Sequence, residues 1–302
     1  MSSSKSKIEI CEVGPRDGLQ NLKRKFSVNE KVKMINSLIS AGVKRIEAGS
    51  FVNPKKVPNM ADFEKVLDRI NREKDVTICG LTLNEKGIQR ALKHGGVNEI
   101  RHVLVASETF SKINQGASID SSIQILENVA TDIRKEEKKL CVVIAAAFGC
   151  PYEGKIKKTK VLNLVKRSLR CGADEILLAD TIGVGVPNQV ISFSKSLRSI
   201  VGGKMFGFHF HNTRNTGYAN AIAALSSGGK ILDSSIGGIG GCPFVPRATG
   251  NIATEDLLYL TSRSGYQVNF DESKLLDIVG WLRKRIPNCV SGQLYDSGYF
   301  LQ

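Results

Sequence analysis

Short runs of apolar and β-branched residues recur along the chain, and a longer segment with helical spacing follows each one. This alternation is expected of a parallel sheet whose strands are covered by helices. Several of the runs are apolar at consecutive positions, as strands buried on both faces should be. Eight runs are predicted to be strands: IEICEV from Ile8, VKRIEA from Val43, VTICGL from Val76, EIRHVLV from Glu99, CVVIAAAF from Cys141, EILLAD from Glu175, FGFHFH from Phe206 and ILDSSI from Ile231.

The segments between these runs carry helix signals. Ser27 stands three residues before Glu30, which is the pattern of a capping box, and amphipathic spacing follows it. The sequence therefore predicts a helix from Ser27 to Ala41. After the eighth run, the segment from Asp271 repeats the helical period and predicts an additional C-terminal helix, with a loop beyond it.

Eight strand–helix units follow one another with no Pro- or Ser-rich linker between them. A barrel of eight such units needs about 250 residues, which fits within this chain. We therefore predict an α/β fold, a (β/α)8 TIM barrel with an additional C-terminal helix, in one domain over residues 1–302. Strand order is not visible in a sequence, so an open doubly wound sheet is the alternative.

Charge adds one class of partner to consider, because 43 Lys and Arg face 29 Asp and Glu, for a formal net charge of +14. Such a charge favours polyanions, and a non-catalytic basic protein that binds them is an alternative from a different functional class. The basic residues are scattered, however, and no nucleic-acid motif is present, so we expect attraction of an anionic small-molecule substrate and no nucleic-acid partner.

The seven cysteines form no C-x-x-C pair, and several lie inside apolar runs, as in a reduced cytosolic protein. The cysteines at 11, 79, 141 and 171 are expected in the core. The polar start MSSSKSK carries no apolar signal region, and no apolar stretch reaches transmembrane length. These features predict a cytoplasmic protein without a membrane partner, while a homo-oligomer stays open.

Polar residues gather where the predicted strands end, which is where parallel α/β folds bind ligands. Five strand ends carry ionisable or metal-binding groups, which is more than packing requires. These groups are Arg16 and Asp17 after the first strand, Glu47 at the second, Asp180 at the sixth, His209 and His211 at the seventh, and Cys242 and Asn251 beyond the eighth.

His209 and His211 stand two residues apart on one strand, so their side chains share a face. Two imidazoles on one face can bind one metal ion, although a lone buried histidine is more often a core residue. Asp17 and Asn251 would add oxygen ligands. Mixed nitrogen and oxygen ligands suit Mg²⁺ or Mn²⁺ better than a thiolate-rich zinc site.

The other polar groups each allow a structural interpretation. Cys242 follows the glycine-rich GGIGG and could be exposed in a loop that closes over a ligand, or it could be a small buried side chain. Arg16 could form a surface ion pair with Asp17, or its guanidinium could stabilise a developing enolate oxygen. Glu47 and Asp180 could be carboxylates at the edge of the core.

Five separated motifs also carry a family resemblance, in order along the chain from about Ile8 to about Leu260. They are GPRDGLQN at 14–21, IEAGSFVNPKKVPNM at 46–60, ADTIGVG at 179–185, HFHNT at 209–213 and GGCPFVPRATGN at 240–251. With these motifs the chain resembles the 3-hydroxy-3-methylglutaryl-CoA lyase family. The segment beyond Asp271 contributes little to the resemblance.

The resemblance implies a carbon–carbon lyase that cleaves 3-hydroxy-3-methylglutaryl-CoA to acetyl-CoA and acetoacetate, a reaction of leucine degradation. It also implies a divalent cation, Mg²⁺ or Mn²⁺, and assigns a role to each matching residue. Asp17, His209, His211 and Asn251 match the metal ligands, Arg16 the residue that stabilises the enolate, Cys242 the proton donor to that enolate, and Glu47 and Asp180 acidic residues that line the site.

Three departures from the family pattern concern the substrate: Asn212, Arg214 and, in the loop after Cys242, Arg247. An added cation near the pocket could pair with a substrate carboxylate, or it could point outward. The acyl group is therefore open, and a citramalyl-CoA-like substrate or an aldol-type acyl-CoA synthase are alternatives. Lys55 and Lys56 are candidates for contacts with the phosphates of CoA.

Overall fold

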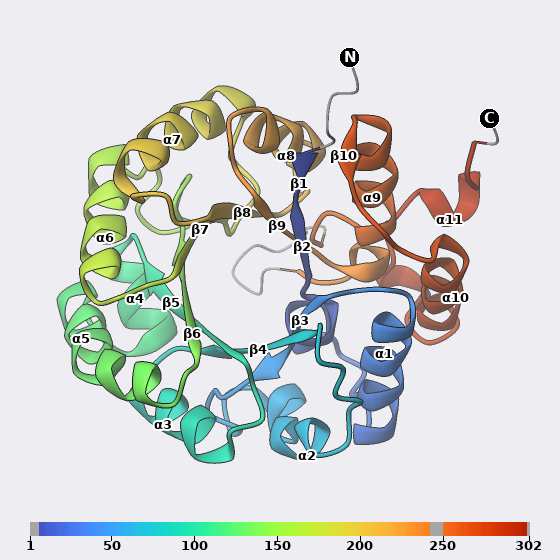
Figure 1. Cartoon of the computed structure of the whole chain (residues 1–302), viewed down its shortest axis with the longest axis horizontal. Helices are drawn as coiled ribbons and strands as arrows, with labels where there is room; N and C mark the ends of the chain where they lie inside the picture. The colour runs from blue at the N-terminus through green and yellow to red at the C-terminus, as the bar shows by residue number, and fades with distance from the viewer. Residues whose placement is uncertain (1–5, 242–249, 301–302) are drawn as a thin grey trace.

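Eight parallel strands close into a barrel in the computed structural model, which describes residues 6–241 and 250–300. Each strand pairs with the next along the chain, and the last pairs with the first, as Figure 1 shows in a view along the barrel axis. The strands are β2 (Glu9–Glu12), β3 (Arg45–Ser50), β4 (Thr77–Thr82), β5 (Glu99–Val105), β6 (Lys139–Ala145), β7 (Glu175–Asp180), β8 (Phe206–Phe210) and β9 (Ile231–Ser234). All eight predicted strands and the TIM barrel are thus confirmed, and the open sheet is excluded.

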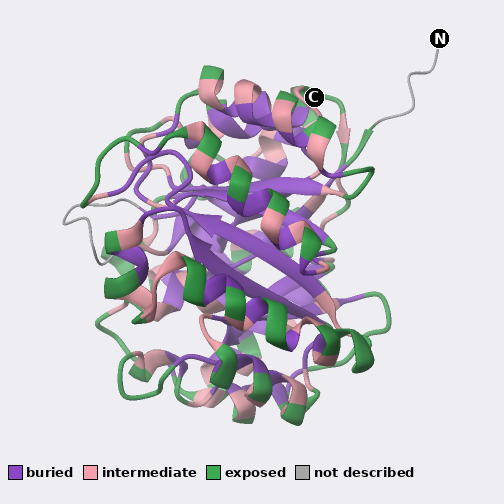
Figure 2. Cartoon of the chain, turned by 90° about the vertical axis from the view of Figure 1, so that its left-hand side faces the viewer, coloured by how far each residue is buried: buried purple, intermediate pink, exposed green. Residues whose placement is uncertain are grey.

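Helices surround the barrel and bury their apolar sides against it, so that exposed residues face outward (Figure 2). Two helices, α4 and α5, follow β5, and each other strand of the barrel is followed by one α-helix before the next strand. The helices are α1 (Val28–Ser40), α2 (Phe63–Leu67), α3 (Glu85–His94), α4 (Glu108–Gln115), α5 (Ile119–Lys135), α6 (Lys158–Arg170), α7 (Pro187–Ile200), α8 (Gly217–Ser226), α9 (Thr254–Arg263), α10 (Glu272–Arg283) and α11 (Leu294–Ser297).

Local signals explain where α1 begins. The hydroxyl of Ser27 accepts a hydrogen bond from the backbone N–H of Glu30, and the Glu30 carboxylate accepts one from the backbone N–H of Ser27. This capping box satisfies two N–H groups that the first turn leaves free, as predicted. The helix predicted from Asp271 is α10, which packs on α1, and short segments α11 and Pro287–Cys289 interrupt the predicted terminal loop.

The interior of the barrel departs from the usual filling of branched apolar side chains. Buried charged residues, Arg45, Glu99, Arg101, Glu175 and Asp233, come from four strands and pair with one another. The predicted core cysteines 11, 79, 141 and 171 are buried, and the first three lie near the Arg101 guanidinium. Small thiols leave space for a long guanidinium, which is paired because burying an unpaired charge is costly.

A short parallel pair lies outside the barrel, formed by β1 (Ser6–Lys7) and β10 (Tyr266–Gln267). Across residues 6–241 and 250–300, no helix combines the length and the apolar character that crossing a membrane requires.

Candidate active site

His209 and His211 lie at the carboxyl end of β8, with ring centroids 5.0 Å apart. Both are buried, and they share a face because alternate residues of a strand point the same way. The Nδ1 atom of His211 is buried without a hydrogen-bond partner. The two imidazoles therefore converge at the barrel mouth, as the spacing of HFH predicts.

Asp17 reaches the same point from the π-helical turn Gly14–Gly18, which follows β2. Its Oδ2 atom lies 3.8 Å from Nε2 of His209 and 3.6 Å from Nε2 of His211. Burial would raise the pKa of Asp17, but Arg16 and the two histidines outweigh it and hold the pKa well below its usual value. The Asp17 carboxylate is thus ionised beside two imidazole nitrogens.

Asn251 completes the group. Its Nδ2 donates to Asp17 Oδ2 at 2.9 Å, while its Oδ1 atom is buried and has no partner. One ligand atom each from Asp17, His209 and His211 lies within 4.8 Å of the others, and an unpartnered amide oxygen sits beside them. This donor set of nitrogen and oxygen atoms fits a divalent cation such as Mg²⁺ or Mn²⁺.

Arg16 and Glu47 form the adjoining part of the site. Arg16 donates from Nε to Glu47 Oε2 at 2.5 Å and from Nη1 to Asp17 Oδ1 at 2.6 Å. Glu47 stands just before a register shift between β3 and β4, and its Oε1 is buried without a hydrogen bond, 4.0 Å from Nη1 of Arg101. Burial raises the pKa of Glu47, although Arg16 and Arg101 oppose the rise. A cation and an available carboxylate oxygen therefore lie beside the metal-ligand candidates.

Asp180 is placed differently from the expectation that it lines the site. Its two oxygens accept hydrogen bonds at 2.9 Å from the backbone N–H groups of Val184 and Gly185. The neighbours Ala179 and Thr181 line the pocket instead. Because side chains alternate along a strand, Asp180 faces away from the pocket and holds the loop after β7.

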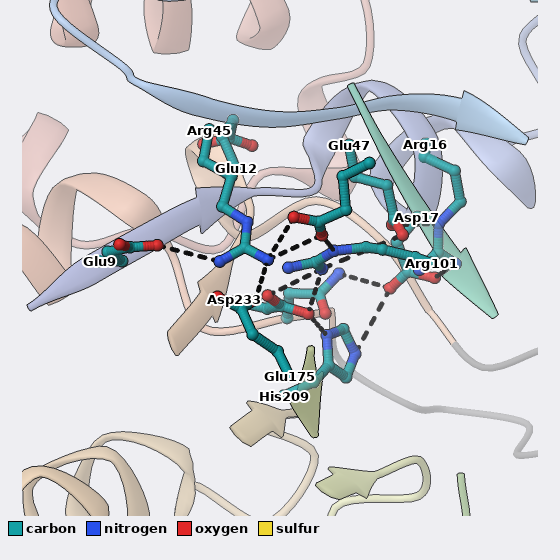
Figure 3. A network of polar contacts seen from close by, with 12 residues as sticks. Glu9, Glu12, Arg16, Asp17, Arg45, Glu47, Arg101, Glu175, His209 and Asp233 are labelled. Carbon is teal, nitrogen blue, oxygen red and sulfur yellow. Dashed lines mark hydrogen bonds and ion pairs between the residues drawn. The ribbon is translucent and has the colours of Figure 1, made fainter. Parts of the chain in front are cut away.

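The residues that sequence reasoning missed are Asp233 on β9 and Arg101 on β5. Nη1 of Arg101 donates to both oxygens of Asp233 at 2.9 Å, and Asp233 Oδ2 lies 3.2 Å from Nδ1 of His209 (Figure 3). Burial would raise the pKa of Asp233, but Arg101 and His209 outweigh it and lower the pKa. Charged letters inside apolar strand runs, EIRHVLV and ILDSSI, were the signal that could have indicated them.

A pocket of about 480 Å³ lies at the mouth of the barrel, and its polar lining includes Arg16, Asp17, Glu47, Arg101, His209, His211 and Asp233. Apolar side chains enclose it as well, among them Leu81, Val103, Phe110 and Ile113. Lys56 belongs to the lining, and Lys55 does not. A pocket with an apolar surface and a few convergent polar groups is typical of a small-molecule site.

The departures at positions 212 and 214 lie in the loop after β8. Asn212 Oδ1 accepts from the backbone N–H of Gly217 at 3.0 Å, at the start of α8. Arg214 Nη1 donates to the carbonyl oxygens of Ile182 and Gly183 at 3.0 and 2.9 Å, so it joins this loop to the loop after β7. Neither residue lines the pocket. Cys242 and Arg247 lie outside the described residues.

Known proteins resemble this chain over most of its length. A family model described as HMGL-like matches residues 7–281. The chain is 38% identical to hydroxymethylglutaryl-CoA lyase YngG of Bacillus subtilis over 93% of both chains. It is also 38% identical to (R)-citramalyl-CoA lyase of Chloroflexus aurantiacus, over 91% of this chain and 90% of that protein.

A solved structure gives the same fold over nearly the whole chain. An HMG-CoA lyase from Acinetobacter baumannii, in complex with coenzyme A and 3-methylmalate, superposes with a TM-score of 0.93 at 37% identity. The match covers 99% of this chain and 97% of that one.

Proposed function

The chain belongs to the HMGL-like family and is a carbon–carbon lyase, and from this premise we propose that it cleaves 3-hydroxy-3-methylglutaryl-CoA to acetyl-CoA and acetoacetate. The observation that carries the proposal is the convergence of Asp17, His209 and His211 beside the Arg16–Glu47 pair at the barrel mouth. The Bacillus relative, named for this substrate, supports it.

We infer that a divalent cation, Mg²⁺ or Mn²⁺, is held by Asp17, His209, His211 and Asn251. When bound, the ion would act as a Lewis acid on the oxygen of the substrate's tertiary hydroxyl group and make its proton easier to remove. The residues themselves hold their ligand atoms ready, since Asp17 is ionised and Asn251 has an available amide oxygen.

Cleavage requires removal of the proton from the tertiary hydroxyl and stabilisation of the enolate that departs. Glu47 offers a buried oxygen that makes no hydrogen bond in the pocket, and its raised pKa suits a general base. The Arg16 guanidinium is fixed by two carboxylates and can stabilise the charge that develops on the thioester oxygen. Cys242 is proposed as the proton donor to the acetyl-CoA enolate, and Asp180 as a residue that positions the loop beneath the substrate.

A second substrate, citramalyl-CoA, is favoured by one observation. The Chloroflexus relative named for that substrate is as similar to this chain as the Bacillus relative is. Both thioesters would yield acetyl-CoA, and they differ in the length of the acid portion. Lys56, in the pocket lining, is proposed to contact a phosphate of CoA. A cytoplasmic location, a role in leucine degradation and a homo-oligomeric state stay predictions.

The test measures acetyl-CoA release from both thioesters in parallel, with Mg²⁺ or Mn²⁺ and again after chelation. His209→Ala and Cys242→Ala should abolish release, and His94→Ala, a histidine at the end of α3, serves as the matched control. The substrate is the thioester from which the wild type and His94→Ala release acetyl-CoA in a metal-dependent way while His209→Ala and Cys242→Ala do not. Absence of release from both thioesters in folded, metal-loaded protein would reject the lyase proposal and bring the synthase or polyanion-binding alternative forward.

A further inference from the structure

A column of ion pairs runs through the barrel interior from its amino-terminal end to the candidate metal ligands (Figure 3). At the far end, Arg45 pairs with Glu9, Glu99 and Glu175. Glu99 also accepts from Nε of Arg101 at 3.0 Å and so links the two arginines. Beyond Arg101 lie Asp233 and His209.

We propose that Arg101 is a positioning residue for the metal site: its guanidinium fixes the carboxylate of Asp233, which in turn fixes the ring and the tautomer of His209. The proposal deepens the proposed function and rests on it for the role of His209 as a metal ligand. Its geometric part, the orientation of His209, holds for the metal-free protein as well.

The contacts define one arrangement of the three groups. Nη1 of Arg101 lies 2.9 Å from both Asp233 oxygens, and Asp233 Oδ2 lies 3.2 Å from Nδ1 of His209. A carboxylate only accepts, so the proton of a neutral His209 belongs on Nδ1. The lone pair on Nε2 then faces Asp17, 3.8 Å away, which is the direction that a metal ligand requires.

An arginine at position 101 is suited to fixing Asp233 because its side chain begins on the opposite side of the barrel. Asp233 is on β9 and Arg101 is on β5, four strands away around an eight-stranded barrel, so the side chain crosses the interior. Nε is held by Glu99, which fixes the plane of the guanidinium while Nη1 meets Asp233. A lysine could carry the charge, but one ammonium group cannot reproduce contacts that diverge from a planar fork.

The alternative is that buried arginines of this barrel only stabilise the fold, and Arg45 allows that alternative to be tested by comparison with Arg101. Both side chains are buried and both share Glu99. Arg45 pairs with glutamates at the amino-terminal end, and within residues 6–241 and 250–300 neither Asp233 nor His209 pairs with it. Loss of either arginine should therefore destabilise the barrel, but only loss of Arg101 should disturb His209.

The first test reads the tautomer directly by NMR of ¹⁵N-histidine-labelled, metal-free protein at one fixed alkaline pH, at which the imidazole of His209 is neutral. The chain has four histidines, so the signals can be assigned by substitution. We expect His209 to carry its proton on Nδ1 in the wild type and in Arg45→Lys, and to show a mixture of tautomers in Arg101→Lys and Arg101→Met. An unchanged His209 signal in both Arg101 variants would overturn the proposal.

The second test titrates Mn²⁺ into the same proteins by calorimetry. Loss of a group that orients a metal-ligating histidine typically weakens metal binding by about 10- to 100-fold, and we expect a loss of this size in Arg101→Lys. Arg45→Lys should bind like the wild type at a similar loss of thermal stability. Equal weakening in both variants contradicts the positioning role. If Arg101→Met fails to fold, Arg101→Lys, which keeps the charge, decides both tests.

The two tests separate this inference from the proposed function. If the wild type binds no Mn²⁺ but Arg101→Lys changes the His209 tautomer, the metal site is rejected and the Arg101–Asp233–His209 linkage is retained. If the wild type binds Mn²⁺ tightly but the His209 signal is the same in the wild type and in the Arg101 variants, the metal site is retained and the linkage is rejected.

Discussion

Asn251 Nδ2 donates a hydrogen bond to Asp17 Oδ2 at 2.9 Å and thereby joins two residues that are 234 positions apart. Asp17 follows the first strand of the barrel and Asn251 follows the last, and these two strands pair to close it. The two oxygen ligands proposed for the cation therefore meet only when the barrel has closed.

Asn251→Ala should weaken Mn²⁺ binding, because it removes an amide oxygen and leaves Asp17 without its neutral donor. We expect a loss of about 10-fold or more, measured by calorimetry. Asn220→Ala is the matched control, since Asn220 is equally buried but donates to the carbonyl oxygen of Gly185. Comparable weakening in Asn220→Ala would show that burial of an asparagine, and not its contact with Asp17, is what matters.

Arg16→Lys should lower kcat by about 10²- to 10³-fold, the usual effect of removing one donor that stabilises a developing oxyanion. The guanidinium meets Glu47 and Asp17 through different nitrogens, and a lysine cannot hold both directions. Steady-state kinetics with circular dichroism as a folding check measures the change. Arg24→Lys, in an exposed ion pair with Glu30, should keep wild-type activity. Near-normal kcat in Arg16→Lys argues against the enolate role.

Asp180→Asn should destabilise the protein by about 1–3 kcal/mol, because the amide turns one acceptor toward a backbone N–H into a donor. Both carboxylate oxygens are used by Val184 and Gly185. Urea unfolding measures the loss, and Mn²⁺ affinity should match that of the wild type. A variant with full stability but weakened metal binding would place Asp180 in the site after all.

His102 should make stability fall in acid. Burial lowers its pKa from 6.5 to about 4, so the folded protein holds the neutral ring while the unfolded chain binds a proton below about pH 6.5. The free energy of unfolding should therefore decrease as pH falls from 6.5 to 4, by up to about 3 kcal/mol from this group. Urea unfolding of His102→Gln across this range should show a correspondingly shallower pH dependence, and an unchanged slope would exclude His102 as its source.

The sequence by itself determined the eight strands and the residues that carry the family motifs, while the choice between a barrel and an open sheet needed the strand order of the structure. Strand runs such as EILLAD are apolar on consecutive positions, and Ser27 with Glu30 marks a helix start, because these signals depend on residues near each other in the chain. The two histidines of HFH share a face for the same local reason. Their meeting with Asp17 and Asn251 followed from the rule that parallel strands deliver their ends to one edge.

Only the tertiary structure decided which polar residues face which way and what they touch. The sequence predicts both Asp180 and Glu47 near strand ends, yet Asp180 turns to the backbone of its own loop while Glu47, the third residue of β3, lines the pocket. Arg101 and Asp233 read as charged interruptions of apolar runs, and nothing local says that they meet across the barrel, 132 positions apart. A buried charge must find a partner, but strand order and register choose that partner, and both arise only when the sheet closes.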